Sequence, residues 1–355
     1  MFLPLFFIPI EAIGEDIPSW VKNNAKWWSE EQISDATFLQ SIEYLVNQKI
    51  IKIDANNQKQ VETIEKNIPS WVKNNAKWWS EEQISDATFL QSIEYLVNQK
   101  IIKIEKIPDQ VFRYSGNSSL FEKFALKEDM RNLNGQLVPI EVKLELKEEN
   151  FEKYSQIGFF DDPSNTIVIK PIFTSTAYWE PGFYTFYRNE CDTSCLTKKI
   201  EFEKPMGFSG SDLGFKVFQL LNYHTVTDFE FSKNPKIIQD YDKVILLHNE
   251  YVTQEMFDAI TKHPKVVYLY PNSLYAQIDV NHEKMEINLV RGHQYPEKSI
   301  DNGFNWKFDN TRPDEFDVDC LEWQFKKIDN GIQLNCYPEN IIDSDFELLK
   351  TIRDY

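Results

Sequence analysis

The sequence lacks long apolar stretches and an excess of basic residues. Apart from Phe2–Ile10, no segment approaches the roughly 20 apolar residues that a membrane-spanning helix needs. The chain has 38 Lys and Arg against 56 Asp and Glu, a formal net charge of −18. Binding to phosphates or to an anionic membrane needs clustered Lys and Arg. The charge therefore argues against a nucleic-acid partner and indicates a solubilising acidic surface.

Several catalytic signatures are also missing. No Gly-x-Ser-x-Gly or Gly-x-Cys-x-Gly nucleophile elbow occurs. Gly207, Gly210 and Gly214 open a helical stretch, where backbone N–H groups can cradle an anion. Their spacing misses both phosphate-loop fingerprints. A tight turn capped by Ser209 or Ser211 is therefore favoured over an anion site.

Cysteine is scarce, but its number is even. The four cysteines lack the Cys-x-x-Cys spacing and the nearby histidines of a zinc site. Two disulfides in an exported protein are the favoured interpretation. Three connectivities are possible, and the simplest pairs Cys191 with Cys195 and Cys320 with Cys336.

The N-terminal apolar run suggests export. Phe2–Ile10 followed by Glu11–Gly14 looks like the hydrophobic part of a secretory signal, cleaved near Ala12 to Gly14. It lacks a basic start, which a start codon placed a few residues too late would explain. The alternative is a buried N-terminal strand.

A perfect tandem repeat follows. Residues 17–53 recur letter for letter as residues 68–104. Pro18 suits the first turn of one helix, and Ser34 or Asp35 can cap a second. Each copy therefore predicts a small helical hairpin, and the polar residues between the copies predict a linker. The apolar face of the second helix consists of Phe38, Ile42, Leu45 and Val46.

The tryptophans of the repeat allow two interpretations. Trp20, Trp27, Trp28 and their copies could stack on sugars or dock on an envelope polymer. They could also fill a core, since a unit of this size needs large aromatic residues to bury enough area. We favour the core.

The repeat resembles a module of exported and cell-surface proteins of ammonia-oxidising archaea. The shared pattern is Ile-Pro-x-Trp-Val-Lys-Asn-Asn-Ala-x-Trp-Trp, followed by Gln-Ile-x-Asp and by Phe and Tyr-Leu. The resemblance covers residues 17–104. It implies an extracellular or envelope-associated protein, with cell-envelope or surface-layer components as partners.

Strands alternating with helices predict an α/β domain with a parallel, three-layer sheet over residues 165–295. Val244–Leu247 is an apolar run that breaks into polar residues before a helix at Thr253–His263. That pattern indicates a buried strand ending at the carboxyl edge of a sheet, where ligands collect. Other expected strands are Thr166–Phe173, Thr225–Asp228, Lys265–Pro271, and a hairpin of Ala276–Val280 with Met285–Val290.

Three groups of residues are candidates for the site. The first is His248, Glu250 and Tyr251, directly after the central strand. The second is the aromatic loop Tyr178–Arg188, which suits carbohydrate or peptide binding. The third is Arg291-Gly-His293, near a hairpin end.

The α/β region resembles the C-terminal domain of N,N-dimethylformamidase large subunits, which has the class I glutamine amidotransferase-like fold. The likeness rests on Leu221–Asp228, Asp240–Leu247 and His248–Met256, and it continues through Asn272–Tyr275 and Val290–Gly292. Two positions depart from the family pattern. Val252 replaces a tryptophan, and His263-Pro-Lys replaces a glycine-rich turn.

The resemblance implies a possible iron site and an amide-hydrolysing activity. The family holds iron with two tyrosinates and a glutamate, and Tyr223 and Tyr251 are the tyrosine counterparts. No glutamate is assigned as the third ligand. Such iron would polarise an amide carbonyl and activate water, with His248 or Glu250 as general base.

The flanking segments complete the expected organisation. A half-exposed strand is predicted within Leu137–Leu146, after the turn signal Asn134-Gly135. A hairpin around Asn330-Gly331 and a short helix from Asp343 predict a disulfide-fastened C-terminal extension. The expected order is a signal-like segment (1–16), repeats (17–53 and 68–104) joined by a linker (54–67), a β-containing segment (105–164), the α/β domain (165–295) and the extension (296–355).

The sequence thus favours an exported archaeal surface protein with a binding or structural role and a non-catalytic amidotransferase-like domain. The alternative is a metal-dependent amidohydrolase acting on C–N bonds. The substrate and the oligomeric state stay open.

Overall fold

The computed structural model describes residues 19–47, 68–98, 101–102, 118–126, 129–133, 136–159, 161, 165–202, 209–308, 310 and 320–355. The chain divides into two compact units, Met1–Asp109 and Gln110–Tyr355. The predicted signal-like segment and the linker lie outside the described residues.

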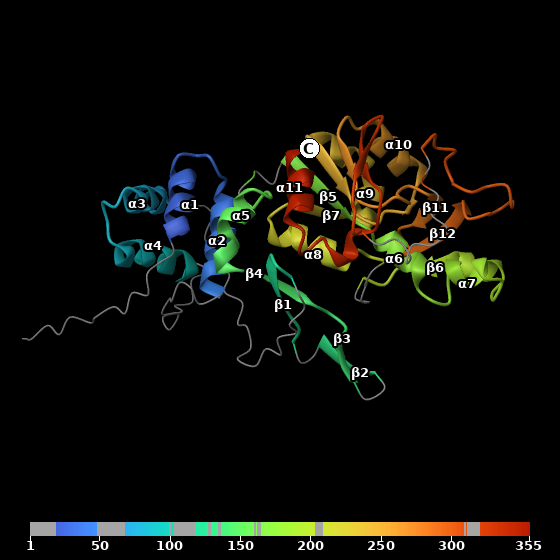
Figure 1. The fold of residues 1–355 in the computed structure, drawn as a ribbon, viewed down its shortest axis with the longest axis horizontal. Helices are drawn as coiled ribbons and strands as arrows, with labels where there is room; N and C mark the ends of the chain where they lie inside the picture. Colours follow the sequence, from blue (N-terminus) through green and yellow to red (C-terminus); the bar gives the residue numbers. More distant parts are fainter. Residues whose placement is uncertain are drawn as a thin grey trace, which may run out of the picture. The chain divides into compact units, whose positions relative to one another are not determined.

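The first unit contains the two repeats, and each forms a helical hairpin (Figure 1). Ser34 caps its helix, because its Oγ accepts a hydrogen bond of 3.1 Å from the Thr37 backbone N–H. The helices are α1 (Ser19–Ser29) and α2 (Asp35–Asn47) in the first copy, and α3 (Ser70–Ser80) and α4 (Asp86–Asn98) in the second.

In each repeat, the second tryptophan of the Trp-Trp pair lies in the core. The Trp28 ring stacks on Phe38 with 3.8 Å between ring centroids, and Trp79 stacks on Phe89 at 3.9 Å. All four rings are fully buried. Trp71 and Trp78, in contrast, are 40% and 43% exposed, so the predicted core role does not extend to them.

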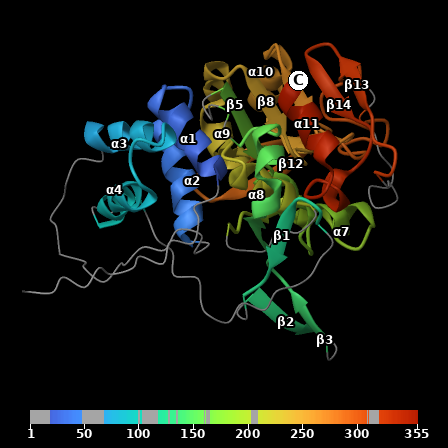
Figure 2. The same ribbon diagram turned by 60° about the vertical axis from the view of Figure 1, so that its left-hand side comes forward.

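The second unit is built around a mixed α/β arrangement with a six-stranded, mostly parallel sheet (Figures 1 and 2). The strand order is β13-β14-β10-β8-β5-β7, and only β13 runs antiparallel to its neighbour. The strands are β5 (Thr166–Lys170), β7 (His224–Thr227), β8 (Lys243–Leu246), β10 (Val266–Tyr268), β13 (Phe325–Ile328) and β14 (Gly331–Leu334). The α/β class predicted from the sequence is confirmed.

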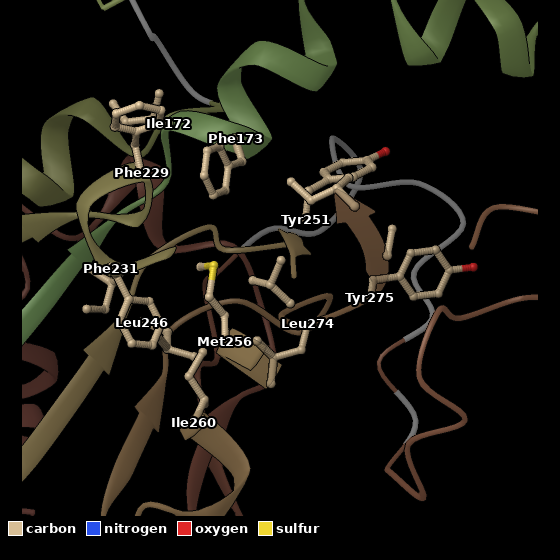
Figure 3. Close-up of a cluster of buried hydrophobic side chains, with 14 of the residues drawn as sticks. Ile172, Phe173, Phe229, Phe231, Leu246, Tyr251, Met256, Ile260, Leu274 and Tyr275 are labelled. Carbon is tan, nitrogen blue, oxygen red and sulfur yellow. The ribbon is translucent and has the colours of Figure 1, made fainter. Parts of the chain in front are cut away.

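Both faces of this sheet are buried. Side chains alternate between the faces of a strand, and Ile167, Ile169 and Leu246 belong to one large apolar cluster. Their neighbours Val168 and Ile245 are equally buried but lie outside that cluster. The cluster is covered by α6 (Ile172–Tyr178), α9 (Asp228–Lys233) and α10 (Gln254–Lys262), which contribute Phe173, Phe229, Met256 and Ile260 (Figure 3).

Two other helices pack against the sheet in the second unit. They are α8 (Asp212–Leu220) and α11 (Phe346–Asp354). The ammonium group of Lys243 in β8 donates to the carbonyl oxygens of Ile352 and Arg353, at 2.9 and 2.8 Å. These bonds tie α11 to the start of the central strand.

A smaller sheet adjoins the carboxyl edge of the central strand. Its order is β6-β12-β11-β9, and β9 continues the chain directly after the loop that follows β8. Its strands are β6 (Thr197–Lys199), β9 (Tyr251–Val252), β11 (Ala276–Asn281) and β12 (Glu286–Arg291). β11 and β12 form the hairpin expected from the sequence.

The C-terminal region is not an appendage to the domain. Its hairpin, β13 with β14, joins the main sheet because β14 pairs with β10. Gly331 makes this approach possible: a Cβ there would lie 1.9 Å from the Val266 carbonyl oxygen. The predicted boundary at residue 295 therefore cuts through the sheet. The structure joins Cys320 to Cys336 and Cys191 to Cys195.

The predicted strand within Leu137–Leu146 is divided in two. β3 (Gln136–Pro139) pairs with β2 (Met130–Leu133), whereas β4 (Lys143–Leu146) pairs with β1 (Phe121–Phe124). Pro139 has no N–H for a continued ladder, which favours the break. Within the described residues, the other elements are α5 (Phe151–Ser155), α7 (Phe183–Tyr187) and the 3-10 helices η2 (Glu148–Asn150), η4 (Thr193–Leu196), η5 (Pro235–Asp240) and η6 (Pro338–Asn340).

Candidate functional site

The loop after β8 is held by hydroxyl groups from two other segments. Ser211 Oγ accepts a 3.0 Å hydrogen bond from the His248 N–H. Thr174 Oγ1 accepts from the N–H groups of Glu250 and Tyr251, at 3.0 and 3.3 Å. Ser211 thus supports this loop, and it makes no side-chain cap on α8, contrary to the prediction for Ser211.

A fully buried carboxylate, Glu250, lies at the centre of the loop. Its Oε2 accepts from the Tyr178 hydroxyl at 2.8 Å and from Asn272 Nδ2 at 3.1 Å. Its Oε1 lies 2.6 Å from His293 Nε2. Several hydrogen bonds of this kind stabilise a buried carboxylate against the cost of desolvation. The arrangement holds the His293 imidazole in one orientation.

Four tyrosines surround His293, and we call them the tyrosine ring. The His293 imidazole stacks on Tyr187 with 4.6 Å between centroids and on Tyr251 with 5.8 Å. Tyr275 and Tyr184 meet it edge-on, at 4.5 and 5.9 Å. The His293 side chain keeps 20% of its surface exposed. Tyr184 and Tyr187 are half-buried, whereas Tyr251 and Tyr275 are buried, so solvent reaches the cluster at His293, Tyr184 and Tyr187.

The tyrosine ring is anchored in the apolar core and ends in hydroxyl groups. The side chains of Tyr251 and Tyr275 adjoin the core, and their hydroxyls point away from it (Figure 3). The Tyr251 and Tyr187 hydroxyls lie 3.2 Å apart. Burial raises the pKa of both phenols well above their usual value, so both stay protonated at neutral pH. Both groups can therefore donate as well as accept hydrogen bonds.

His248, a predicted general base, lies behind Glu250. It is fully buried and stacks on Tyr270 at 4.5 Å. Burial lowers its pKa to about 3, so the imidazole is neutral and accepts from Asn272 Nδ2 at 3.0 Å. A ligand entering from solvent does not meet this ring. His248 therefore supports Asn272, and the predicted base role suits His293 better than either His248 or Glu250.

The structure does not bring the predicted iron ligands together. Tyr223 directly precedes β7, at the amino edge of the sheet, whereas Tyr251 follows β8 at the carboxyl edge. The Tyr223 hydroxyl donates to the Ile157 carbonyl at 3.1 Å. In the part of the chain that the structure describes, no three His, Cys, Asp or Glu side chains are grouped as for a metal. The predicted tyrosine pair therefore does not fit an iron ion.

Sequence reasoning missed the roles of Asn272 and His293. Asn272 lies in a segment that carries the family resemblance, and His293 belongs to the candidate group Arg291-Gly-His293, but their pairing with Glu250 spans 22 and 43 residues. Arg291, by contrast, serves the local structure. Its guanidinium donates to the Gly303 carbonyl at 2.8 Å and to Asn305 Oδ1 at 2.9 Å.

The sequence matches no protein-family model, and no curated protein is similar to it at a significant level. Among the described residues, no helix is both long enough and apolar enough to cross a membrane.

Proposed function

We propose that this chain is an exported archaeal cell-surface protein whose α/β domain binds a small neutral ligand of the cell envelope. A glycan hydroxyl face is the ligand chemistry that suits the site best. The observation that carries the proposal is the partly exposed His293, held by the buried Glu250 and surrounded by the tyrosine ring.

The chemistry of the ring supports a sugar ligand. Aromatic faces cover the apolar C–H face of a pyranose, while phenol and imidazole groups exchange hydrogen bonds with its hydroxyls. Three ring members come from different segments: Tyr187 from α7, Tyr251 from β9 and Tyr275 from the residue before β11. The Tyr178–Arg188 segment thus contributes to the same site as the loop after β8.

Other features support a place outside the cell. The two disulfides are typical of an oxidising compartment. The apolar N-terminal run and the resemblance of the repeats favour export. Envelope or surface-layer components are the proposed partners. We also propose that the domain has the class I glutamine amidotransferase-like fold, which the mostly parallel sheet supports.

Binding can be measured by calorimetry with a panel of soluble oligosaccharides. We expect at least one to bind the wild type, and Tyr187→Ala to weaken that binding tenfold or more because a stacking face is lost. The matched control is Phe202→Ala, which removes an aromatic side chain that is 42% exposed and outside the ring. Equal binding by all three proteins would contradict the proposal.

A second candidate is hydrolysis of a C–N bond, favoured by the 2.6 Å contact between Glu250 and His293. A carboxylate oriented on an imidazole is a common general-base pair. His293 would take a proton from water as the water oxygen attacks an amide carbon, and would return it to the departing amine. Glu250 would stabilise the imidazolium.

Amine release from short amides tests this second candidate. His293→Gln keeps a polar side chain of similar length but removes the base, so any turnover should fall by at least a hundredfold. Absence of amine release by the wild type, or equal release by His293→Gln, excludes this role for His293.

A further inference from the structure

The two repeats contact each other through matching residues. Lys22 Nζ lies 3.6 Å from Glu82 Oε1, and Lys73 Nζ lies 3.7 Å from Glu31 Oε1. Positions 22 and 73 are the same position of the repeat, and so are positions 31 and 82. The two ion pairs are therefore one contact made twice, in opposite directions.

A second contact is reciprocal in the same way. The Lys22 ammonium lies 5.8 Å from the ring centroid of Trp79, and the Lys73 ammonium lies 5.7 Å from that of Trp28. α1 and α3 pack together, and each has a fully buried valine and alanine at equivalent positions. Contacts that are unchanged when the two copies are exchanged define an isologous, two-fold interface.

A two-fold interface of this kind determines which surfaces can bind to it. It accepts any surface identical to its own, and the two repeats are identical in every residue. The first repeat therefore meets the same surface on the second repeat of its own chain as on either repeat of another chain. Only the tether between Asn47 and Ser70 favours the partner in the same chain, because it raises the local concentration of that partner.

We propose that the repeat is a self-association module whose partner is a second copy of itself. In one molecule the two copies pack against each other. This surface is then covered within the chain, and the chain does not dimerise through it. When the contact between the two repeats of one chain is weakened, two chains exchange partners and form a dimer. In this dimer the first repeats of the two chains pack on each other, and so do the second repeats. This proposal is independent of the ligand site.

A charge exchange in the full-length chain tests the proposal. Lys22→Glu combined with Glu31→Lys, in the first repeat alone, makes both reciprocal contacts within a chain repulsive. Between two such chains, the altered first repeats again present opposite charges to each other, and so do the unaltered second repeats. We expect the mass measured by light scattering to double as concentration rises, while the wild type stays monomeric.

The matched control restores opposite charges within the chain. It combines Lys22→Glu, Glu31→Lys, Lys73→Glu and Glu82→Lys. This variant should return to the monomer. The proposal is overturned if the doubly and fourfold substituted chains have the same mass at every concentration, whether monomeric or dimeric.

The substitutions should leave the helices intact, because the four side chains are 30% to 84% exposed. Circular dichroism checks this. If helicity is lost, a zero-length amine–carboxyl crosslinker applied to the wild type gives a second test. Mixed isotopically light and heavy chains, unfolded and refolded at high concentration, should yield Lys22–Glu31 crosslinks between chains. Absence of any light–heavy crosslink at these residues overturns the proposal.

Discussion

Glu250 is fully buried at the candidate site, so its carboxyl group carries a desolvation cost. Tyr178, Asn272 and His293 offset that cost with hydrogen bonds. Truncating one partner leaves a carboxylate oxygen less well solvated by the protein. The stability of the domain therefore depends on the residues that orient its site.

Tyr178→Phe removes one donor and changes little else in shape. We expect a loss of about 1.5–3 kcal/mol in the free energy of unfolding, the usual range for a hydrogen bond to a charged group. Urea denaturation measures it. Tyr295→Phe, a partly buried tyrosine of the same domain, is the control and should change stability by less than about 0.5 kcal/mol.

Because His248 is buried, we expect the free energy of unfolding to fall as the pH is lowered. The pKa of His248 is about 3 in the folded protein and near 6.5 in the unfolded chain. Below pH 6.5 this imidazole therefore binds more protons in the unfolded chain than in the folded protein. The contribution of His248 therefore lowers stability as the pH falls from 6.5 towards 3. Between pH 7 and pH 5 the loss amounts to about 2 kcal/mol.

The measurement compares urea denaturation at pH 7 and pH 5. His248→Gln should lose less stability between these two values than the wild type, even if it is less stable at both. His224→Gln changes an exposed histidine and should keep the wild-type dependence. A His248→Gln protein with the full wild-type loss would refute the assignment.

Residues of the site were predictable where they followed one another in the chain. His248, Glu250 and Tyr251 come directly after an apolar run, and the end of such a run marks the carboxyl edge. The sequence places His293 only near a hairpin end, because no local pattern indicates a partner 43 residues away. Tyr223 failed as a ligand because a motif gives residue types and not the edge at which they lie.

Helices and strands were likewise predictable from local sequence, but their long-range pairing was not. β8 and α10 follow from an apolar run and from Thr253, whose Oγ1 accepts from the Met256 N–H at 3.3 Å. The hairpin β13–β14 also follows from its Asn-Gly turn. Its place beside β10 does not, because pairing between strands about 65 residues apart leaves no local pattern.

The Cys320–Cys336 disulfide brackets the β13–β14 hairpin. It closes a loop of 16 residues, and opening it should lower stability by about 3 kcal/mol through the entropy of the unfolded chain. The Cys191–Cys195 loop spans only 4 residues, so its removal should cost about 1 kcal/mol less. Thermal unfolding of the two double Cys→Ser variants tests this order, and the reverse order would contradict it.

The whole molecule carries a formal charge of −18. Repulsion among the excess negative charges opposes the compact folded state. Raising sodium chloride from about 10 to 150 mM shortens the Debye length from about 30 to 8 Å. We expect the Tm to rise by a few degrees over this range. A Tm that falls instead would show that attractive ion pairs dominate the balance.

The paired repeats also have a consequence for the gene. Perfect amino-acid identity between two tandem copies indicates a recent duplication, and such duplications change the number of copies by whole units. Because the modules close in pairs, an array with an even count satisfies every face within one chain. An odd count leaves one face without a partner, so the addition or loss of a single copy would change a monomer into a chain that must associate.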